Sequence, residues 1–258
     1  MKITNRHKLP DEIVNAFLKD RYTDASEAPF DYSASTLVSP IQKTILEKRH
    51  PHNLVVRDVV DYFWRFMGSI AHNVLEEAWH ESMGSKVEKR LYLEVEGKIL
   101  SGKIDCYGDH QLRDYKTCKA YKIVRGGYED WEKQLNIYAH LLIANGHPLS
   151  VLKIYAMVFD WKERDKNKPG YPDAPVVVIP FRLWSDHERS NYIYQRIMLL
   201  EKALTLSDEE LPEQTPCSRK EMWQDLTDYA VTKKGSKRVY KTFDNFKEAE
   251  DYLKEYAE

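Results

Sequence analysis

The strongest constraint on the fold is a change of hydrophobic period near the middle of the chain. Apolar residues recur at helical spacing over residues 58–80, which predicts a long helix with one apolar face. The period then falls to two, and residues 87–95, 99–107 and 111–117 alternate as strands separated by short turns. The sequence therefore predicts a long helix followed by an antiparallel meander of three strands.

Helical and strand patterns also alternate in the rest of the chain. Helices are expected at residues 10–22, after Pro40 within residues 33–49, at 128–145 and at 185–204, and strands at 151–161 and 176–184. Helix, three strands, helix and strand in this order predict an α/β fold with a central mixed sheet flanked by helices.

The composition changes after Leu206. A polar stretch with two prolines follows, which is typical of a linker. Residues 229–243 then have the pattern of a hairpin, and residues 245–256 that of a helix. We therefore expect a main domain over residues 1–206, with a helical N-terminal part, and a C-terminal appendage over residues 207–258 that contains the linker, the hairpin and the helix.

The overall composition is that of a water-soluble globular protein, with 42% hydrophobic and 31% charged residues in a chain of 258. The longest apolar runs fall far short of the roughly 18 residues of a membrane-spanning helix, and the first residues lack the apolar core of a signal peptide. Three scattered cysteines predict free thiols in a reducing cytoplasm. The net charge of −2 leaves nucleic-acid binding open, because positive charge can be confined to one groove.

Two aspartates and a lysine fall on neighbouring predicted strands. Asp114 and Lys116 are two residues apart and share a strand face, and a hairpin would bring Asp105 beside them. Two adjacent carboxylates favour a cation between them, and their oxygens suit Mg²⁺ or Mn²⁺. Lys116 would then orient the attacking water or neutralise charge developing on a phosphate, which fits phosphodiester hydrolysis. The alternative is a surface hairpin whose charges serve solubility.

The long helix adds a histidine to this group. His72 and Glu76 are four residues apart and share a face, while Ile70, Val74 and Leu75 are expected on the core side. An imidazole is a common ligand for transition metals and could complete the site with the aspartates. A hydrogen-bonded structural histidine is the alternative.

A third polar pair lies on the helix predicted after the meander. Gln134 and Tyr138 are four residues apart and free to face the strands or a ligand, if Leu135 and its neighbours fill the core. Alternatively, Tyr138 is a residue at the core boundary.

Basic residues follow the predicted catalytic lysine at regular intervals. Lys119, Lys122 and Arg125 succeed Lys116 without an acidic residue among them, as expected either for a loop that holds a phosphate backbone or for a solvated basic loop. A second basic group, at the tip of the C-terminal hairpin, is expected to contact DNA, with a solvated turn as the alternative; it comprises Lys233, Lys234, Lys237 and Arg238.

The segments GSIAHNVLEE, GKID, DYKT and QLNIY, in this order, resemble the motifs of the RecB-like branch of the PD-(D/E)XK nucleases. The four motifs lie within residues 68–138, and residues 32–50 and the C-terminal segment that begins PCSRKEMW also resemble phage-encoded members of this group. The resemblance implies metal ligands at His72, Asp105, Asp114 and the backbone carbonyl of Tyr115, a catalytic lysine at Lys116, an arranging role for Gln134 and Tyr138, and a supporting role for Glu76.

The resemblance, strongest to phage-encoded members, implies a Mg²⁺- or Mn²⁺-dependent deoxyribonuclease. The expected activity is that of an exonuclease in recombination, repair or DNA processing, with DNA as substrate and a phage recombinase or single-strand-binding protein as partner. An endonuclease, a flap nuclease and an inactive DNA-binding protein of the same fold are the alternatives. Many relatives hold an iron–sulfur cluster with four cysteines. We expect none here, because Ser39-Pro40 stands where the first cysteine would be and Cys217 alone lies in the C-terminal region.

Overall fold

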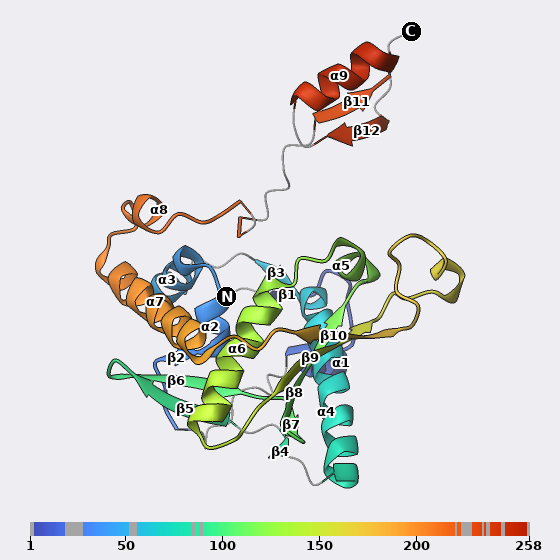
Figure 1. Cartoon of the computed structure of the whole chain (residues 1–258). Helices are drawn as coiled ribbons and strands as arrows, with labels where there is room; N and C mark the ends of the chain where they lie inside the picture. Colours follow the sequence, from blue (N-terminus) through green and yellow to red (C-terminus); the bar gives the residue numbers. More distant parts are fainter. Residues whose placement is uncertain are drawn as a thin grey trace.

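A five-stranded mixed sheet lies at the centre of the protein (Figure 1). The computed structural model describes residues 3–18, 28–51, 56–83, 86–87, 90–219, 221–222, 229–233, 235, 238–243 and 246–256. The strand order is β10-β9-β8-β7-β4, in which β8 and β9 are parallel and the other neighbours antiparallel. The strands are β4 (Lys86–Val87), β7 (Cys106–Gly108), β8 (Gln111–Cys118), β9 (Val151–Val158) and β10 (Val176–Phe181).

The first part of the predicted meander belongs to a second, separate sheet. It has the order β2-β6-β5, with β2 (Tyr32–Ser33), β5 (Arg90–Val95) and β6 (Lys98–Lys103). The prediction of one continuous meander was therefore wrong, because the expected strand at residues 99–107 divides into β6 and β7. The division falls at Asp105, whose carboxylate accepts the hydrogen bond of the Tyr115 backbone N–H.

Helices surround these sheets at nearly the predicted positions. They are α1 (Asp11–Leu18), α2 (Ala34–Val38), α3 (Ile41–Arg49), α4 (Phe63–Met83), α5 (Ala120–Arg125), α6 (Glu129–Ala144), α7 (Asp186–Thr205), α8 (Leu211–Gln214) and α9 (Phe246–Tyr256). A 3₁₀ turn (Val59–Tyr62) precedes α4, and the short strands β1 (Ile3–Thr4) and β3 (Arg57–Asp58) pair in parallel. The basic segment predicted as a loop forms the helix α5. No helix in the described ranges is long and apolar enough to cross a membrane.

Strand β8 is covered on both faces, because α4 and α6 both contact it. Its residues from Leu112 to Tyr115 are buried without alternation, as expected for a strand between two layers. Strand β9 alternates strictly between buried and half-buried residues, which indicates that its second face is less completely covered. Asp114 thus lies in the best-covered part of the sheet.

The orientation of α4 differs from the prediction. Ile70 and Val74 were expected on its core side, but they are 41% and 60% exposed. The helix packs instead through Phe66 against Phe17 of α1, with ring centroids 5.0 Å apart, and turns His72 toward β8. Helical spacing identifies the residues that share a face, whereas the packing partners decide which face is buried.

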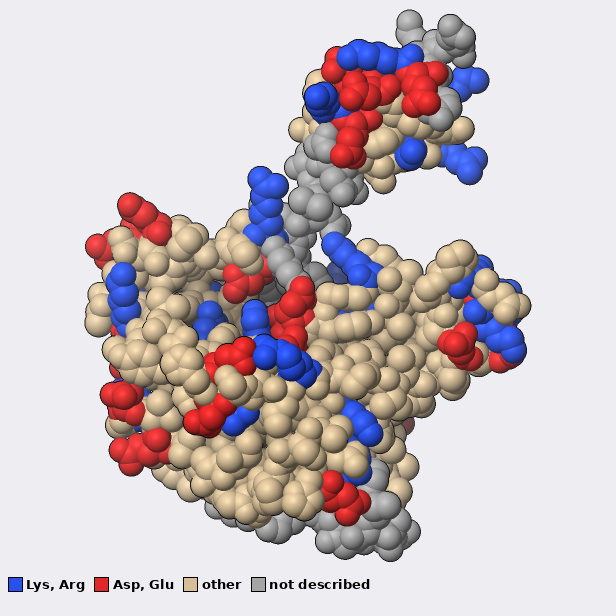
Figure 2. Space-filling view, in the orientation of Figure 1, with Lys and Arg blue, Asp and Glu red and all other residues tan. Residues whose placement is uncertain are grey.

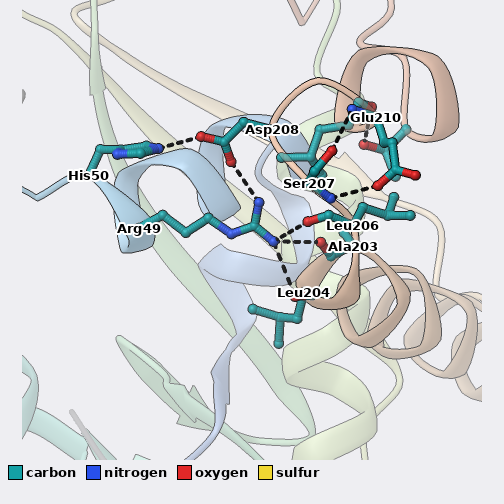
Figure 3. A network of polar contacts seen from close by, with 10 residues as sticks. Arg49, His50, Ala203, Leu204, Leu206, Ser207, Asp208 and Glu210 are labelled. Carbon is teal, nitrogen blue, oxygen red and sulfur yellow. Dashed lines mark hydrogen bonds and ion pairs between the residues drawn. The ribbon is translucent and has the colours of Figure 1, made fainter.

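The first residues of the predicted linker are attached to the main body (Figure 3). The Arg49 guanidinium donates hydrogen bonds to the carbonyl oxygens of Ala203, Leu204 and Leu206 and lies 2.6 Å from Asp208. Leu211 of α8 is 1% exposed and belongs to the main hydrophobic core. The segment that begins after Leu206 therefore starts as a packed part of the fold.

The C-terminal hairpin and helix are present, as β11 (Tyr229–Thr232), β12 (Val239–Phe243) and α9. Two ring contacts join the helix to the hairpin: Tyr229 to Phe246, with centroids 5.4 Å apart, and Phe243 to Tyr252, at 5.1 Å. Ala249 of α9 is buried, at 5% exposure. The three elements therefore form a small packed unit.

Candidate active site

A cleft of about 530 Å³ brings together the residues singled out in the sequence. Helix α4, strands β6 and β8, and helix α6 contribute to its walls. The predicted residues among those lining it are Gly68, His72, Asp105, Asp114, Tyr115, Lys116, Gln134 and Tyr138. Residues separated by up to 70 positions in the chain thus face one space.

Asp114 and Lys116 form an ion pair on one face of β8. The ammonium nitrogen of Lys116 lies 2.8 Å from Asp114 Oδ2, and the aspartate side chain is only 3% exposed. Oδ2 accepts no hydrogen bond of proper geometry from any residue that the structure describes. A buried carboxylate oxygen is costly without a positive partner, so Lys116 supplies the charge that Asp114 requires.

His72 and Asp105 meet at the backbone of Tyr115. Asp105 Oδ2 accepts a hydrogen bond from Tyr115 N at 2.8 Å, and His72 Nε2 lies 3.0 Å from the Tyr115 carbonyl oxygen. His72 Nδ1 is 3.6 Å from Asp105 Oδ1. Strands β7 and β8 are antiparallel and pair Cys106 with Arg113. Asp105, which precedes Cys106, therefore lies near Asp114, which follows Arg113.

Gln134 and Tyr138 line the cleft from helix α6. Gln134 Nε2 donates to the Tyr138 hydroxyl at 2.9 Å, so the pair acts as one polar unit on α6. This helix approaches β6 closely at Gly102. A Cβ atom at Gly102 would lie 2.6 Å from Leu141 Cδ1 and 2.9 Å from Tyr138 Cδ1, so a larger residue cannot occupy this position without displacing α6.

The candidate ligand atoms at the site are of the chemical types that bind divalent cations. The two carboxylates and the carbonyl oxygen suit Mg²⁺ or Mn²⁺, and the imidazole is a common ligand for transition metals. Among the described side chains, no three His, Cys, Asp or Glu residues already surround a common point. A cation bound there would have to compete with the Lys116 ammonium for the buried carboxylate of Asp114.

The predicted basic residues differ in their surroundings. Lys119 is exposed, whereas the Lys122 ammonium donates to the Gly127 carbonyl at 2.7 Å, and Arg125 donates to the Tyr121 hydroxyl at 3.1 Å. Lys233 and Arg238 of the hairpin tip are exposed; Lys234, Lys237 and the side chain of Glu76 lie outside the described parts of the chain. On the face seen in Figure 2, acidic and basic side chains are interspersed, as the balanced composition suggests.

Arg90 and Trp64 are among the cleft residues that the sequence prediction did not include. Arg90 of β5 lines the cleft and donates to the Ser101 hydroxyl at 3.1 Å, and nothing in the strand pattern distinguishes it. Trp64 also lines the cleft. It precedes Gly68 by four residues and His72 by eight, so helical spacing alone places it on the same face of α4 and could have identified it.

Comparisons with known proteins support the fold. No protein-family model matches the chain, and no curated protein matches it in sequence. The crystal structure of SSO0001 is similar, with a TM-score of 0.51 and 15% identity over 73% of this chain and 85% of that one.

Two bacterial exonucleases resemble the fold more loosely. The phage-related exonuclease from Haemophilus somnus has a TM-score of 0.45 at 11% identity, over 72% of this chain and 97% of its own. The alkaline exonuclease LHK-Exo from Laribacter hongkongensis, in its complex with dAMP, has a TM-score of 0.42 at 11% identity, over 71% and 92%. At these identities the likeness concerns the fold alone.

Proposed function

We propose that this protein is a metal-dependent DNA nuclease with a PD-(D/E)XK core, acting as an exonuclease in phage-type recombination, repair or DNA processing. The observation that carries the proposal is the convergence of His72, Asp105, Asp114 and Lys116 on one cleft from α4, β8 and the bend before β7. These residues belong to the motifs that resemble the RecB-like nucleases. Their convergence disfavours a decorative surface hairpin, because Asp114 is almost fully buried.

A divalent ion would be held by Asp105, Asp114, His72 and the Tyr115 carbonyl oxygen. When bound, such an ion supplies a Lewis acid that polarises the scissile phosphate and acidifies water. Asp105 is already oriented by the Tyr115 N–H, so its second oxygen, Oδ1, remains directed toward His72. The protein therefore prepares the ligand geometry through its own backbone.

Lys116 has two partners in succession. In the structure its ammonium balances Asp114, and with a divalent ion held by that carboxylate the ammonium would be available to the phosphate. There it stabilises the negative charge that grows in the transition state or orients the attacking water. The Gln134 and Tyr138 pair, joined by its own hydrogen bond, would position the DNA end in the cleft.

The test compares Lys116→Ala and Asp114→Asn with a matched control. Lys153→Ala removes a lysine of the adjacent strand β9, where its ammonium contacts Gln111 at 3.2 Å and does not line the cleft. Single-turnover cleavage of labelled DNA with Mg²⁺ or Mn²⁺ should fall by about 10² or more for Lys116→Ala, as for a lost electrostatic stabiliser. Metal titration should show weaker binding for Asp114→Asn, while the control resembles the wild type.

Circular dichroism must show that the variants are folded before their rates are compared. Cleavage at the wild-type rate by Lys116→Ala or Asp114→Asn would refute the assignment of the site. Wild-type protein that binds DNA yet cleaves single-stranded, blunt and nicked substrates no faster with metal than with EDTA would identify a DNA-binding protein on a nuclease fold.

A further inference from the structure

An exposed tryptophan lies at the cleft beside the proposed catalytic residues. Trp64 is in the first turn of α4 and is 49% exposed, although an indole is among the most favourable side chains to bury. Gly68 and His72 follow at intervals of four, and all three line the cleft. The indole ring therefore lies on the same face of α4 as the histidine of the proposed metal site, and both side chains line the cleft.

Neighbouring aromatic rings hold this indole in one orientation. The ring of Phe159 stacks on it at a centroid distance of 6.2 Å and an interplanar angle of 26°. The ring of Phe63 approaches it edge-on, at 5.3 Å and 71°. A half-exposed ring that is fixed in this way loses little conformational freedom when a planar ligand stacks on it.

Positive charge accompanies the ring. The ammonium nitrogen of Lys119 lies 5.8 Å from the Trp64 ring centroid. Lys119 follows Lys116 by three residues and is exposed, so a cation for a phosphate stands next to a planar surface for a base. Proteins that bind single-stranded nucleic acid combine these two features, because every base has a π-face and every linkage has a charge.

We propose that Trp64 stacks an unpaired nucleobase of the DNA strand held in the cleft, while Lys119 contacts an adjacent phosphate. This inference rests on the proposed function. Trp64 and His72 are eight residues apart, about 12 Å along a helix, which corresponds to roughly three or four nucleotides at about 3.4 Å per stacked step. A base inside a duplex has both faces covered by its neighbours. The substrate is therefore a strand with a single-stranded or frayed stretch next to the cleavage site.

The test measures binding to fluorescent oligonucleotides in EDTA, so that hydrolysis does not interfere. Trp64→Ala should weaken binding of a single strand by about five- to 150-fold, the range equivalent to one lost stacked base, with little effect on a blunt duplex. Trp64→Phe, which keeps a π-face, should restore most of the affinity. The matched control is Tyr194→Ala, which removes a 39% exposed aromatic residue of α7 outside the cleft lining and should change nothing.

A series of oligonucleotides with one abasic site at successive positions identifies the stacked base. One position should weaken binding to the wild type by a similar factor and have no further effect on Trp64→Ala, because the same contact is already missing. The inference is overturned if Trp64→Ala binds the single strand like the wild type, or loses single strand and duplex equally. Failure of the proposed function is a separate result, since it would appear as metal-independent behaviour of the wild type in the cleavage assay.

Discussion

The contact between β6 and α6 at Gly102 gives a quantitative test of how the site is built. In Gly102→Ala the new methyl carbon would lie 2.6 Å from Leu141 Cδ1 and about as close to the Tyr138 ring, at 2.9 and 3.0 Å. Ordinary carbon contacts are near 3.5 to 4.0 Å, so α6 must move away by roughly 1 Å. Both side chains are buried, at 0% for Leu141 and 7% for Tyr138, and neither can turn into solvent without leaving the core.

Overpacking of this kind costs about 1 to 3 kcal/mol. Replacing a strand glycine recovers about 0.5 to 1 kcal/mol of backbone entropy, so the net loss should lie between about 0 and 2.5 kcal/mol, with a midpoint of about 1 kcal/mol. For a chain of this size, each kcal/mol lowers Tm by about 2 to 4 °C. Because Tyr138 carries the hydroxyl bonded to Gln134, cleavage should also decrease in proportion to the displacement of α6.

Thermal and urea denaturation measure the stability loss, and Gly68→Ala is the matched control. A Cβ at Gly68 would be 3.5 Å from Thr117 Oγ1, an ordinary contact, and Gly68 lies within helix α4. The control should therefore be as stable as the wild type or more stable, by up to about 1 kcal/mol. A Gly102→Ala protein with unchanged Tm and unchanged activity would refute the close packing of α6 on β6.

Three other predictions concern the rest of the chain. Hydrogen bonds from His50 and Arg49 hold the pKa of Asp208 below its usual range. These contacts therefore stabilise the fold at a pH above the usual pKa of an aspartate, and the stabilisation is lost as the pH falls through the lowered pKa. Asp208→Asn should lower Tm at pH 7, and the difference in Tm from the wild type should vanish in acid. Replacing the basic residues of the hairpin tip by Ala should weaken DNA binding and flatten its dependence on salt, with turnover at saturating DNA unchanged; identical salt slopes would contradict a role in binding. The tip residues to be replaced are Lys233, Lys234, Lys237 and Arg238. Purified protein should be colourless and contain no iron or acid-labile sulfide, which elemental analysis checks, since three dispersed cysteines cannot supply four ligands.

The sequence by itself predicted most of the helices and strands, and it predicted which of the singled-out residues share one face of a helix or strand. The period of two in residues 111–117 places Asp114 and Lys116 on one strand face, and the structure has them on one face of β8. Spacing of four places Gln134 beside Tyr138, and the two are hydrogen-bonded. These inferences succeed because the geometry of a single helix or strand depends only on local backbone structure.

The tertiary structure decided which face of each helix or strand is buried and which element covers it. The alternation of residues 99–107 continues through Asp105, yet the strand breaks there because the carboxylate takes a backbone N–H of β8. Similarly, Ile70 and Val74 match a core face but remain exposed, since α1 and β8 cover other sides of α4. The close approach at Gly102 and the exposed ring of Trp64 arise in the same way, from contacts between segments distant in the chain. Local periodicity carries no information about such contacts, because the partner that covers a face is set by the packing of the whole chain.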